Sequence, residues 1–265
     1  SALYWTTYEN RIAGYGIKIP STWKILEDET LDVLLKGKVA VIQSKKGYRF
    51  SLDAVLLAHF LRVRDGETIV DLGTGSGVIP LILCFLHSSL HVAGIEIQAA
   101  MVERALRSAA WNGFEQRMKI VQGDVCSVEQ IFSPQSFDGV ICNPPYLGLK
   151  RGRINPDPER RVARHEIRAS LRHFLQAGFY LLREKGKMAL IYPAERAVDL
   201  LQAMREESLE PKRMRWVHSF PTSEAALILV EGVKGAGSEV TVVPPLVVYE
   251  EPGIYTEEVK KFFDR

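Results

Sequence analysis

Asp71-Leu72-Gly73-Thr74-Gly75-Ser76-Gly77 is the most informative segment of this chain. It joins a β-branched, apolar run at 68–71 to an apolar run at 78–87, which predicts a tight turn between a strand and a helix. Glycines at such a turn let the backbone approach a ligand closely, and the first amides of the helix point toward that ligand. We therefore predict a crevice for a nucleotide-like ligand at this turn.

From residue 68 onward, short β-rich runs alternate with amphipathic helical stretches, which is typical of a parallel sheet with helices on both faces. The expected strands are 68–71, 91–96, 118–121, 137–142, 186–192, 213–218 and 225–231. The expected helices are 78–87, 99–111, 164–182 and 194–207. No helix fits between the last two strands, so we expect an antiparallel hairpin there. The predicted fold class is α/β, with a mostly parallel seven-stranded sheet and an antiparallel last strand.

The segment before this core predicts a small cap. Residues 30–43 alternate as a hairpin that turns near Gly37, and residues 52–62 are typical of a short helix. The tail after Gly232 holds glycines and prolines around a β-rich stretch, which predicts a loop and an added strand. We expect an N-terminal extension and cap over residues 1–64, followed by the α/β domain over residues 65–265 with a C-terminal strand extension.

The composition is that of an ordinary globular protein. Of 265 residues, 46% are hydrophobic and 25% are charged, which excludes disordered and fibrous chains. The longest apolar run, 78–86, is far shorter than the roughly 20 residues that cross a bilayer. Residues 1–10 show no secretory signal, and three cysteines without paired spacing fit a reducing compartment. We therefore expect a cytoplasmic protein without a membrane partner.

Three acidic residues close three successive predicted strands. Glycine at position 78 would complete a dinucleotide fingerprint, but Val78 stands there and Asp71 precedes the glycines, which favours S-adenosylmethionine over NAD. Glu96 can accept both hydroxyls of a ribose, although an acid there is also typical of a helix start. Asp124 can accept an adenine amino group. Because the carboxyl ends of parallel strands line one crevice, the three acids together predict a cofactor site.

The motif Asn143-Pro144-Pro145-Tyr146 follows the strand predicted at 137–142. A planar exocyclic amine is a poor nucleophile because its lone pair is delocalised. The side-chain oxygen of Asn143 and the carbonyl of Pro144 can accept hydrogen bonds from such an NH2 group and aim its lone pair at a methyl donor. Two prolines fix the backbone, and the Tyr146 ring can stack on a planar group. We therefore predict amine methylation, with catalytic roles for Asn143, Pro144 and Tyr146.

The segment 147–168 carries seven basic and three acidic residues, a charge of +4 in a chain whose total is +2. Contact with RNA phosphates is one interpretation, and a solvated arginine-rich loop is the other. The candidate nucleic-acid residues are Lys150, Arg151, Arg153, Arg160, Arg161 and Arg164. A basic surface could be extended by Lys45, Lys46, Arg49, Lys212, Arg213 and Arg215.

Other chemistry has little support in the sequence. The histidines His87, His91 and His165 lack a suitably spaced third ligand, so we predict no metal. Cys142 is predicted to be a buried strand residue rather than a nucleophile. No oligomeric state is predicted.

The glycine turn, the acids at 96 and 124 and the Asn-Pro-Pro-Tyr (NPPY) motif together resemble class I methyltransferases that act on amino groups. From about residue 30 to residue 259, the chain is most similar to the bacterial tRNA adenine-N6 methyltransferases that modify the purine beside the anticodon of valine tRNA. The similarity includes the segments 47–58, 163–166, 244–249 and 253–256.

This resemblance implies a Rossmann-like class I methyltransferase domain, S-adenosylmethionine as cofactor, and methyl transfer to the N6 amine of an adenine in RNA, namely tRNA. It also implies that Phe50 lies over the cofactor. The cofactor-binding residues expected in this way are Phe50, Asp71, Gly73, Thr74, Gly75, Gly77, Glu96, Ile97, Asp124, Val125 and Asn143.

Three alternatives stay open at this point. A protein glutamine amide presents the same planar NH2 group, but enzymes of that kind usually carry a longer helical domain before the glycine turn. Methylation of guanine N2 in ribosomal RNA fits the same motif. A non-catalytic RNA-binding module could use the same scaffold, although the intact residues Asp71, Glu96 and Asn143 argue against it.

Overall fold

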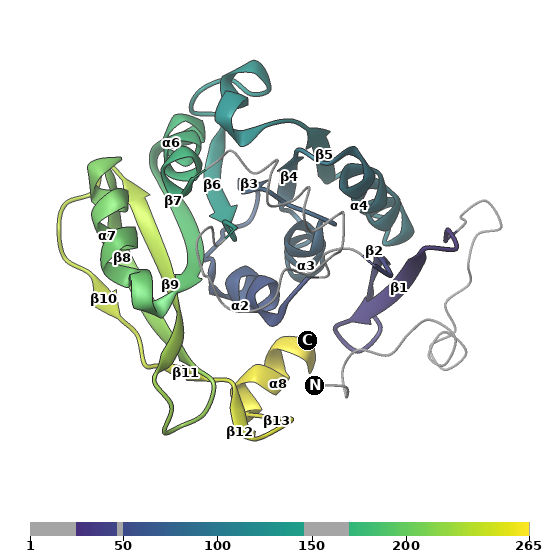
Figure 1. Cartoon of the computed structure of the whole chain (residues 1–265). Coiled ribbons are helices and arrows are strands. Elements are labelled where there is room, and N and C mark those ends of the chain that lie inside the picture. Colours follow the sequence, from purple (N-terminus) through teal and green to yellow (C-terminus); the bar gives the residue numbers. More distant parts are fainter. Residues whose placement is uncertain (1–24, 47–49, 146–169, 265) are drawn as a thin grey trace.

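A central, mostly parallel sheet organises the chain (Figure 1). The computed structural model describes residues 25–46, 50–145 and 170–264. Within these residues the sheet contains, in spatial order, β5 (Met118–Gln122), β4 (His91–Glu96), β3 (Thr68–Leu72), β6 (Phe137–Cys142), β7 (Leu182–Pro193), β9 (Ala225–Lys234) and β8 (Leu209–His218). Strand β9 is antiparallel to both β7 and β8. The seven predicted strands and the antiparallel hairpin are thus confirmed, but the described sheet has nine strands, because two short strands of the C-terminal tail join it.

The strand order reverses beside β3. The chain passes from β3 to β4 and β5 on one side, and then returns to place β6 on the other side of β3. In the register of the sheet, Leu72 of β3 lies between Ile95 of β4 and Cys142 of β6. Ligands of open α/β sheets bind at such a reversal, outside the carboxyl ends of the strands. We call this end of the sheet the catalytic edge.

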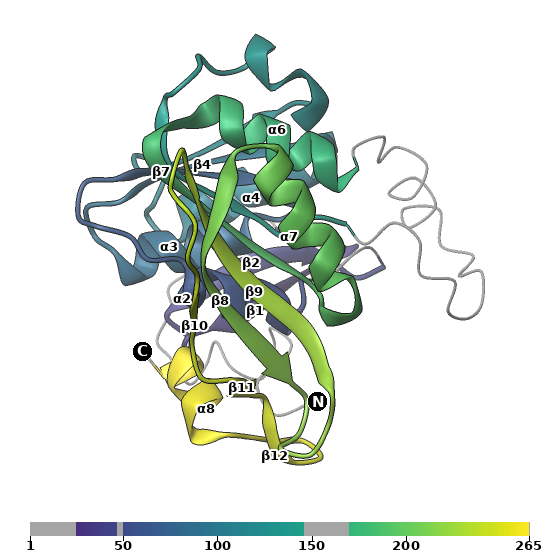
Figure 2. The ribbon, with the colours of Figure 1, turned by 90° about the vertical axis from the view of Figure 1, so that its left-hand side faces the viewer.

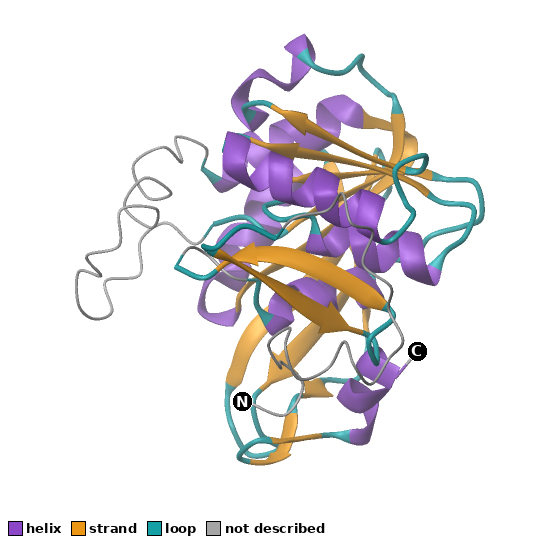
Figure 3. Ribbon diagram, turned by 90° about the vertical axis from the view of Figure 1, so that its right-hand side faces the viewer, coloured by secondary structure: helices purple, strands orange, loops and turns teal. Residues whose placement is uncertain are grey.

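Helices cover both faces of the sheet (Figure 3). One face packs against α2 (Leu52–Phe60), α3 (Val78–Leu86) and α4 (Ala99–Trp111). The other face packs against the 3-10 helix η2 (Val125–Gln130), α6 (Leu171–Leu181) and α7 (Ala197–Glu206), which follows the short η3 (Ala194–Arg196). Because successive strand residues point to opposite faces, Ile69 and Val70 lie in different cores, and both are buried.

The predicted cap is a β-hairpin of β1 (Glu29–Leu34) and β2 (Val39–Ser44). Its turn includes Gly37 with φ +82°, a left-handed conformation that glycine adopts without strain. The hairpin turning near Gly37 and the helix that follows it are confirmed. The helix predicted at 164–182 corresponds to α6, and residues 164–169 lie outside the described residues.

Two side chains, one in α4 and one directly after it, form hydrogen bonds with the backbone of β2 in the cap hairpin. The Asn112 amide accepts from the backbone N–H of Ala40 (2.9 Å) and donates to the carbonyl of the same residue (2.7 Å). The hydroxyl of Ser108 accepts from the N–H of Ile42 at 2.9 Å. Unpaired strand edges invite unwanted pairing, so these contacts both protect β2 and fix the cap on the helix that follows β4.

The C-terminal tail differs from the prediction of a loop and one added strand. Two short strands, β10 (Thr241–Val242) and β11 (Leu246–Val247), run parallel to β8 (Figure 2). A small hairpin of β12 (Tyr249–Glu251) and β13 (Ile254–Tyr255) then leads into the helix α8 (Glu257–Asp264).

The prediction missed α8, although the sequence carried a signal for it. The Thr256 hydroxyl caps the helix by accepting from the N–H of Val259 at 3.4 Å, and two acids occupy the first turn. Val259 and Phe263 are buried at a spacing of four residues, and Phe262 stacks on His59 of α2.

Among the described residues, no helix has both the length and the apolar character needed to cross a bilayer.

Candidate active site

The glycine turn between β3 and α3 is built as its sequence predicts. Gly73, Gly75 and Gly77 have φ angles of +74°, +56° and +77°, the left-handed region that favours glycine. The backbone N–H groups of Gly73 and Thr74 both donate to the carbonyl of Ile95 at 2.9 Å. The turn is therefore fastened to the end of β4.

Gly77 shows why a side chain is not tolerated at the end of this turn. A Cβ atom at this position would lie 2.8 Å from Cε of Met118 and 3.0 Å from Cβ of Ala105. We expect Gly77→Ala to lower the free energy of unfolding by about 2–4 kcal/mol, from backbone strain and overpacking together. The matched control is Gly113→Ala, because Gly113 has a similar φ of +70° with no atom within 4 Å. Equal losses in urea denaturation of the two variants would show that the crowding has no effect.

Asp71 is a buried carboxyl group at the end of β3, with an exposed fraction of 1%. Burial raises its pKa to about 7; the nearby Thr74 hydroxyl counteracts this in part, and the charge of Glu96 adds to it. Among the described residues, neither carboxyl oxygen has a hydrogen-bond partner of acceptable geometry, and the same holds for the Thr74 hydroxyl. Buried polar groups are almost always satisfied, so this cluster fits a ligand that brings hydrogen-bond donors.

Glu96 ends β4 and ties two backbone segments together. Its Oε2 accepts from the N–H of Gly75 at 2.9 Å, and its Oε1 accepts from the N–H of Gln98 at 3.0 Å. Burial raises the pKa of this carboxyl, and the backbone donors offset part of the rise. Each carboxylate oxygen can accept a second hydrogen bond, so the group can still bind a pair of hydroxyls.

Asp124 follows β5 and caps η2. Its Oδ1 accepts from the N–H of Cys126 at 2.8 Å, and its second oxygen takes no part in this cap. The backbone N–H of Gly123 donates to the carbonyl of Glu96 at 2.9 Å, which joins the ends of β4 and β5. Two further candidates for the cofactor site follow these acids in the sequence. Val125, after Asp124, is buried, and Ile97, after Glu96, is exposed.

Asn143 follows β6 directly, on the other side of β3. Its side chain is half-buried, and Pro144 is buried. Tyr146 lies outside the described residues. Phe50 is half-buried just before α2, and its backbone N–H donates to Oε1 of Gln43 at 2.9 Å. The placement of Phe50 over a cofactor stays a prediction.

The structure therefore brings the main candidates together. Asp71, Glu96, Asp124 and Asn143 stand at the carboxyl ends of four neighbouring strands, β3, β4, β5 and β6. The sequence analysis missed Gly94, where a Cβ atom would lie 2.8 Å from Cγ2 of Thr74. An isolated glycine inside a strand is a signal of such close approach.

Two of the basic residues considered for a nucleic-acid surface have other partners. Arg213 is buried, pairs with Glu231 at 3.0 Å and lies 3.8 Å from the centroid of the Phe60 ring. Arg215 pairs with Glu258 at 2.8 Å. The expectation that Arg213 extends an exposed basic surface is wrong. Its guanidinium is buried in an ion pair with Glu231, and breaking a buried pair would leave an uncompensated charge in the interior. The candidates between residues 150 and 164, and Arg49, lie outside the described residues.

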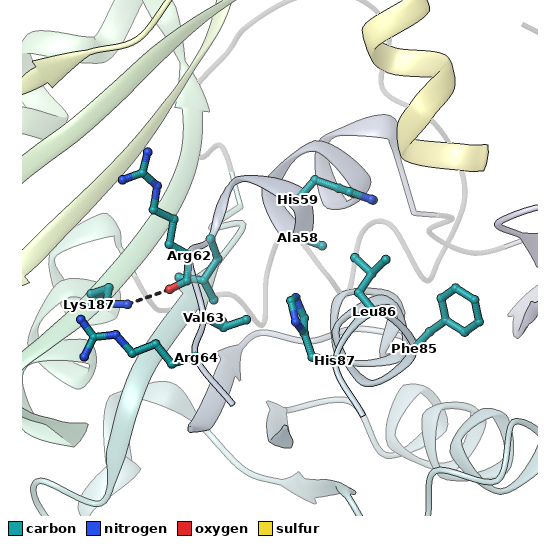
Figure 4. A pocket seen from close by; sticks show the side chains of 10 residues that line it. Ala58, His59, Arg62, Val63, Arg64, Phe85, Leu86, His87 and Lys187 are labelled. Carbon is teal, nitrogen blue, oxygen red and sulfur yellow. Dashed lines mark hydrogen bonds between the residues drawn. The ribbon is translucent and has the colours of Figure 1, made fainter. Parts of the chain in front are cut away.

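A cavity of about 730 Å³ lies between the end of α2 and the end of α3 (Figure 4). Its lining comes from the segment 58–64 before β3, from the end of α3 and from Lys187 of β7, which is paired with Gly139 near the start of β6. The Lys187 ammonium donates to the carbonyl of Arg62 at 2.8 Å. The cavity therefore lies at the amino-terminal ends of the strands and does not belong to the site described above.

Cys142 is fully buried, as predicted, and burial raises the pKa of its thiol, with the nearby charge of Asp71 acting in the same direction. Within the described ranges, no three His, Cys, Asp or Glu side chains are grouped to hold a metal ion.

Comparisons with known proteins agree with this geometry. The family model described as Methyltransferase domain matches residues 63–234. A tRNA1(Val) (adenine(37)-N6)-methyltransferase of Porphyromonas gingivalis (strain W83) is 32% identical over 236 residues, 86% of this chain and 91% of the relative. One of Parabacteroides distasonis is 30% identical over 198 residues, 73% of this chain and 80% of the relative.

Among solved structures, a predicted O-methyltransferase from Agrobacterium tumefaciens superposes with a TM-score of 0.65 and 22% identity, covering 80% of this chain and 95% of that one. The fold is therefore the Rossmann-like class I methyltransferase fold. The sequence matches establish the family as well as the fold, because relatives of 30% identity or more cover most of this chain. They show that this protein is a member of the tRNA1(Val) (adenine(37)-N6)-methyltransferase family.

Proposed function

We propose that this protein transfers a methyl group from S-adenosylmethionine to the N6 amine of adenine 37 in valine tRNA. The observation that carries the proposal is the alignment of Asp71, Glu96 and Asp124 beside Asn143 at the reversal of strand order. Relatives that cover most of this chain bear the name of that activity.

The residues at this edge fit the cofactor. The unsatisfied carboxyl of Asp71 and hydroxyl of Thr74 suit the charged amino group of its methionine part. The free acceptor sites of Glu96 suit the ribose hydroxyls, and the second oxygen of Asp124 suits the adenine amine. When bound, S-adenosylmethionine supplies a methyl group on a positively charged sulfur.

Asn143 and Pro144 prepare the target amine. The side-chain oxygen of Asn143 and the carbonyl of Pro144 accept hydrogen bonds from the NH2 group and turn its lone pair toward the methyl carbon. The N6 nitrogen gains an N–C bond while the C–S bond breaks, and the nitrogen then releases one proton. Because the methylated nitrogen is acidic, neither Asn143 nor Tyr146 has to act as a strong base.

The test is methyl transfer from labelled cofactor to unmodified valine tRNA, followed by nucleoside analysis. We expect N6-methyladenosine in this tRNA and none when position 37 carries guanine. Ribosomal RNA and a protein extract are tested in parallel, because they represent the two other amines that fit the motif. Label in protein, with tRNA unlabelled, would overturn the proposal in favour of a glutamine amide.

The basic segment after Asn143 is proposed to contact RNA phosphates. We expect the double change Arg151→Gln and Arg153→Gln to weaken tRNA binding and to reduce the slope of log Kd against log salt by about 1.4, because each of the two phosphate contacts contributes about 0.7. The control is Arg205→Gln, which removes one positive charge from the last turn of α7, at the end of the helix that lies away from the catalytic edge. An unchanged slope in the double variant would remove this segment from the RNA site.

We also propose that residues 1–64 serve as an extension and cap on the methyltransferase domain of residues 65–265. The docking of the cap hairpin onto α4 and the start of the family match at residue 63 support this division. A tRNA substrate fits the cytoplasmic location expected from the sequence.

A further inference from the structure

The cofactor residues occupy only one half of the catalytic edge. Asp71, Glu96 and Asp124 end the strands β3, β4 and β5, which all lie on one side of β6. On the other side of β6 come β7, β9 and β8, as the order of labels across Figure 1 shows. A target base held at Asn143 therefore has the cofactor on one side and the ends of β7, β9 and β8 on the other.

A row of two aromatic residues and one isoleucine crosses these three strands close to the catalytic edge. Tyr192 of β7 is paired in register with Ile228 of β9, and Ile228 is paired with Trp216 of β8. Paired residues of antiparallel strands share one face of the sheet. Tyr192 and Ile228 are buried, whereas Trp216 is half-buried and packs against the same core. One side of Trp216 thus packs against the core, and part of the residue stays exposed to solvent.

Arg196 lies at the same end of the sheet, in the turn that follows β7. The centre of its guanidinium lies 5.8 Å from the centroid of the Tyr192 ring, and its side chain is 43% exposed. It pairs with Asp199 at 3.1 Å, but both side chains are exposed, and such pairs hold weakly. Because Asp199 pairs with the guanidinium and the neighbouring residue Glu195 is also acidic, the local charge favours stacking on a base over contact with a phosphate.

We propose that Trp216 and Arg196 hold the nucleotides next to the target adenine by stacking on their bases. This inference rests on the proposed function, since it names further contacts of the same RNA site. Proteins hold the unstacked bases of single-stranded loops on aromatic rings and guanidinium planes. The two residues serve binding of RNA and take no part in the methyl transfer itself.

The test compares Trp216→Leu and Arg196→Gln with two controls. Arg205→Gln changes an arginine at the other end of α7, where it pairs with Glu210 at 3.1 Å, and Met214→Leu changes a residue on the same face of β8. We expect the first two variants to raise KM for tRNA about 5- to 20-fold and to leave kcat and the Kd of S-adenosylmethionine within about twofold. The controls are expected to behave as the unchanged protein.

A second measurement isolates the stacking contact. An anticodon stem-loop with an abasic nucleotide beside the target should bind the unchanged protein about tenfold more weakly, but should bind Trp216→Leu with little further loss. Independent, multiplying losses would overturn the inference. Arg196→Gln, an exposed change, gives the same comparison if Trp216→Leu unfolds. Absence of methyl transfer by the unchanged protein would instead refute the proposed function, so the two failures are distinguishable.

Discussion

Replacing Asn143 by alanine is expected to lower kcat for tRNA methylation by on the order of 10²- to 10³-fold, the usual cost of losing one preorganised hydrogen bond in a reacting site. The lost contacts are to the target amine, so the Kd of S-adenosylmethionine is expected to stay within about tenfold. Single-turnover transfer of labelled methyl and calorimetric titration of the cofactor measure the two quantities separately.

The variant Asn143→Asp serves as the matched control, because it keeps a side-chain oxygen that can accept from the amine. We expect it to retain at least about tenfold more activity than Asn143→Ala, with a similar melting temperature. Full activity of the alanine variant would refute the assigned role. Equal loss in both variants would show that hydrogen-bond acceptance by this side chain is not what matters.

Replacing Asp71 by asparagine is expected to have opposite effects on cofactor affinity and on stability. The buried carboxyl has a pKa of about 7 in the folded protein, above its value in an unfolded chain. Ionisation therefore costs stability progressively as pH rises from about 4 to about 7, and the full cost remains above that range. At pH 8, Asp71→Asn is expected to raise the free energy of unfolding by on the order of 4 kcal/mol, and by less at pH 5.

The same change removes a negative charge that the cofactor's amino group would pair with. We expect a roughly 10- to 100-fold higher Kd for S-adenosylmethionine at pH 8. In the unchanged protein, affinity should rise with pH up to about 7, because binding favours the ionised carboxyl; in the variant, this dependence should be absent. Titrations between pH 5.5 and pH 8.5 test both statements, and a variant with unchanged affinity at pH 8 would contradict them.

Asp138→Asn serves as a control, because its expected effect on stability has the opposite sign to that of Asp71→Asn. Although burial raises the pKa of Asp138, hydrogen bonds from Thr68 and Arg183 lower it overall. A lowered pKa means that this carboxylate stabilises the fold at neutral pH and that its contribution is lost in acid. The variant should therefore be less stable than the unchanged protein at pH 7, with little effect on cofactor binding.

Local patterns were sufficient to predict the elements of the sheet. The central parallel strands β3 and β6 are buried on both faces along most of their length, so their sequences are short apolar runs. The edge strand β5 exposes Lys119 but keeps the apolar residues of its buried face. Helix α8 escaped prediction because its eight residues bury only Val259 and Phe263. Their spacing and the cap at Thr256 were visible, but such a short amphipathic stretch forms only when a partner such as α2 covers it.

Basic residues in the sequence predicted an exposed surface less well than polar residues at strand ends predicted the candidate site. Lys212, Arg213 and Arg215 follow one another on β8, but Arg213 is buried against Glu231, and Arg215 is bound to Glu258 of α8. These partners lie 18 and 43 residues away. A basic run therefore says nothing about exposure until the tertiary fold has brought its acids into place.

By itself, the sequence determined the order of the core strands and helices along the chain, the glycine turn and the identity of the polar residues at the strand ends. These features depend on local periodicity and on the conformations that single residues can adopt. Only the tertiary structure decided that the Asp71 carboxyl is buried, that Glu96 is held by the N–H of Gly75, and that Tyr192 and Trp216 share one row. Burial, pKa and cross-strand register depend on segments far apart in the chain, so they exist only once the sheet has formed.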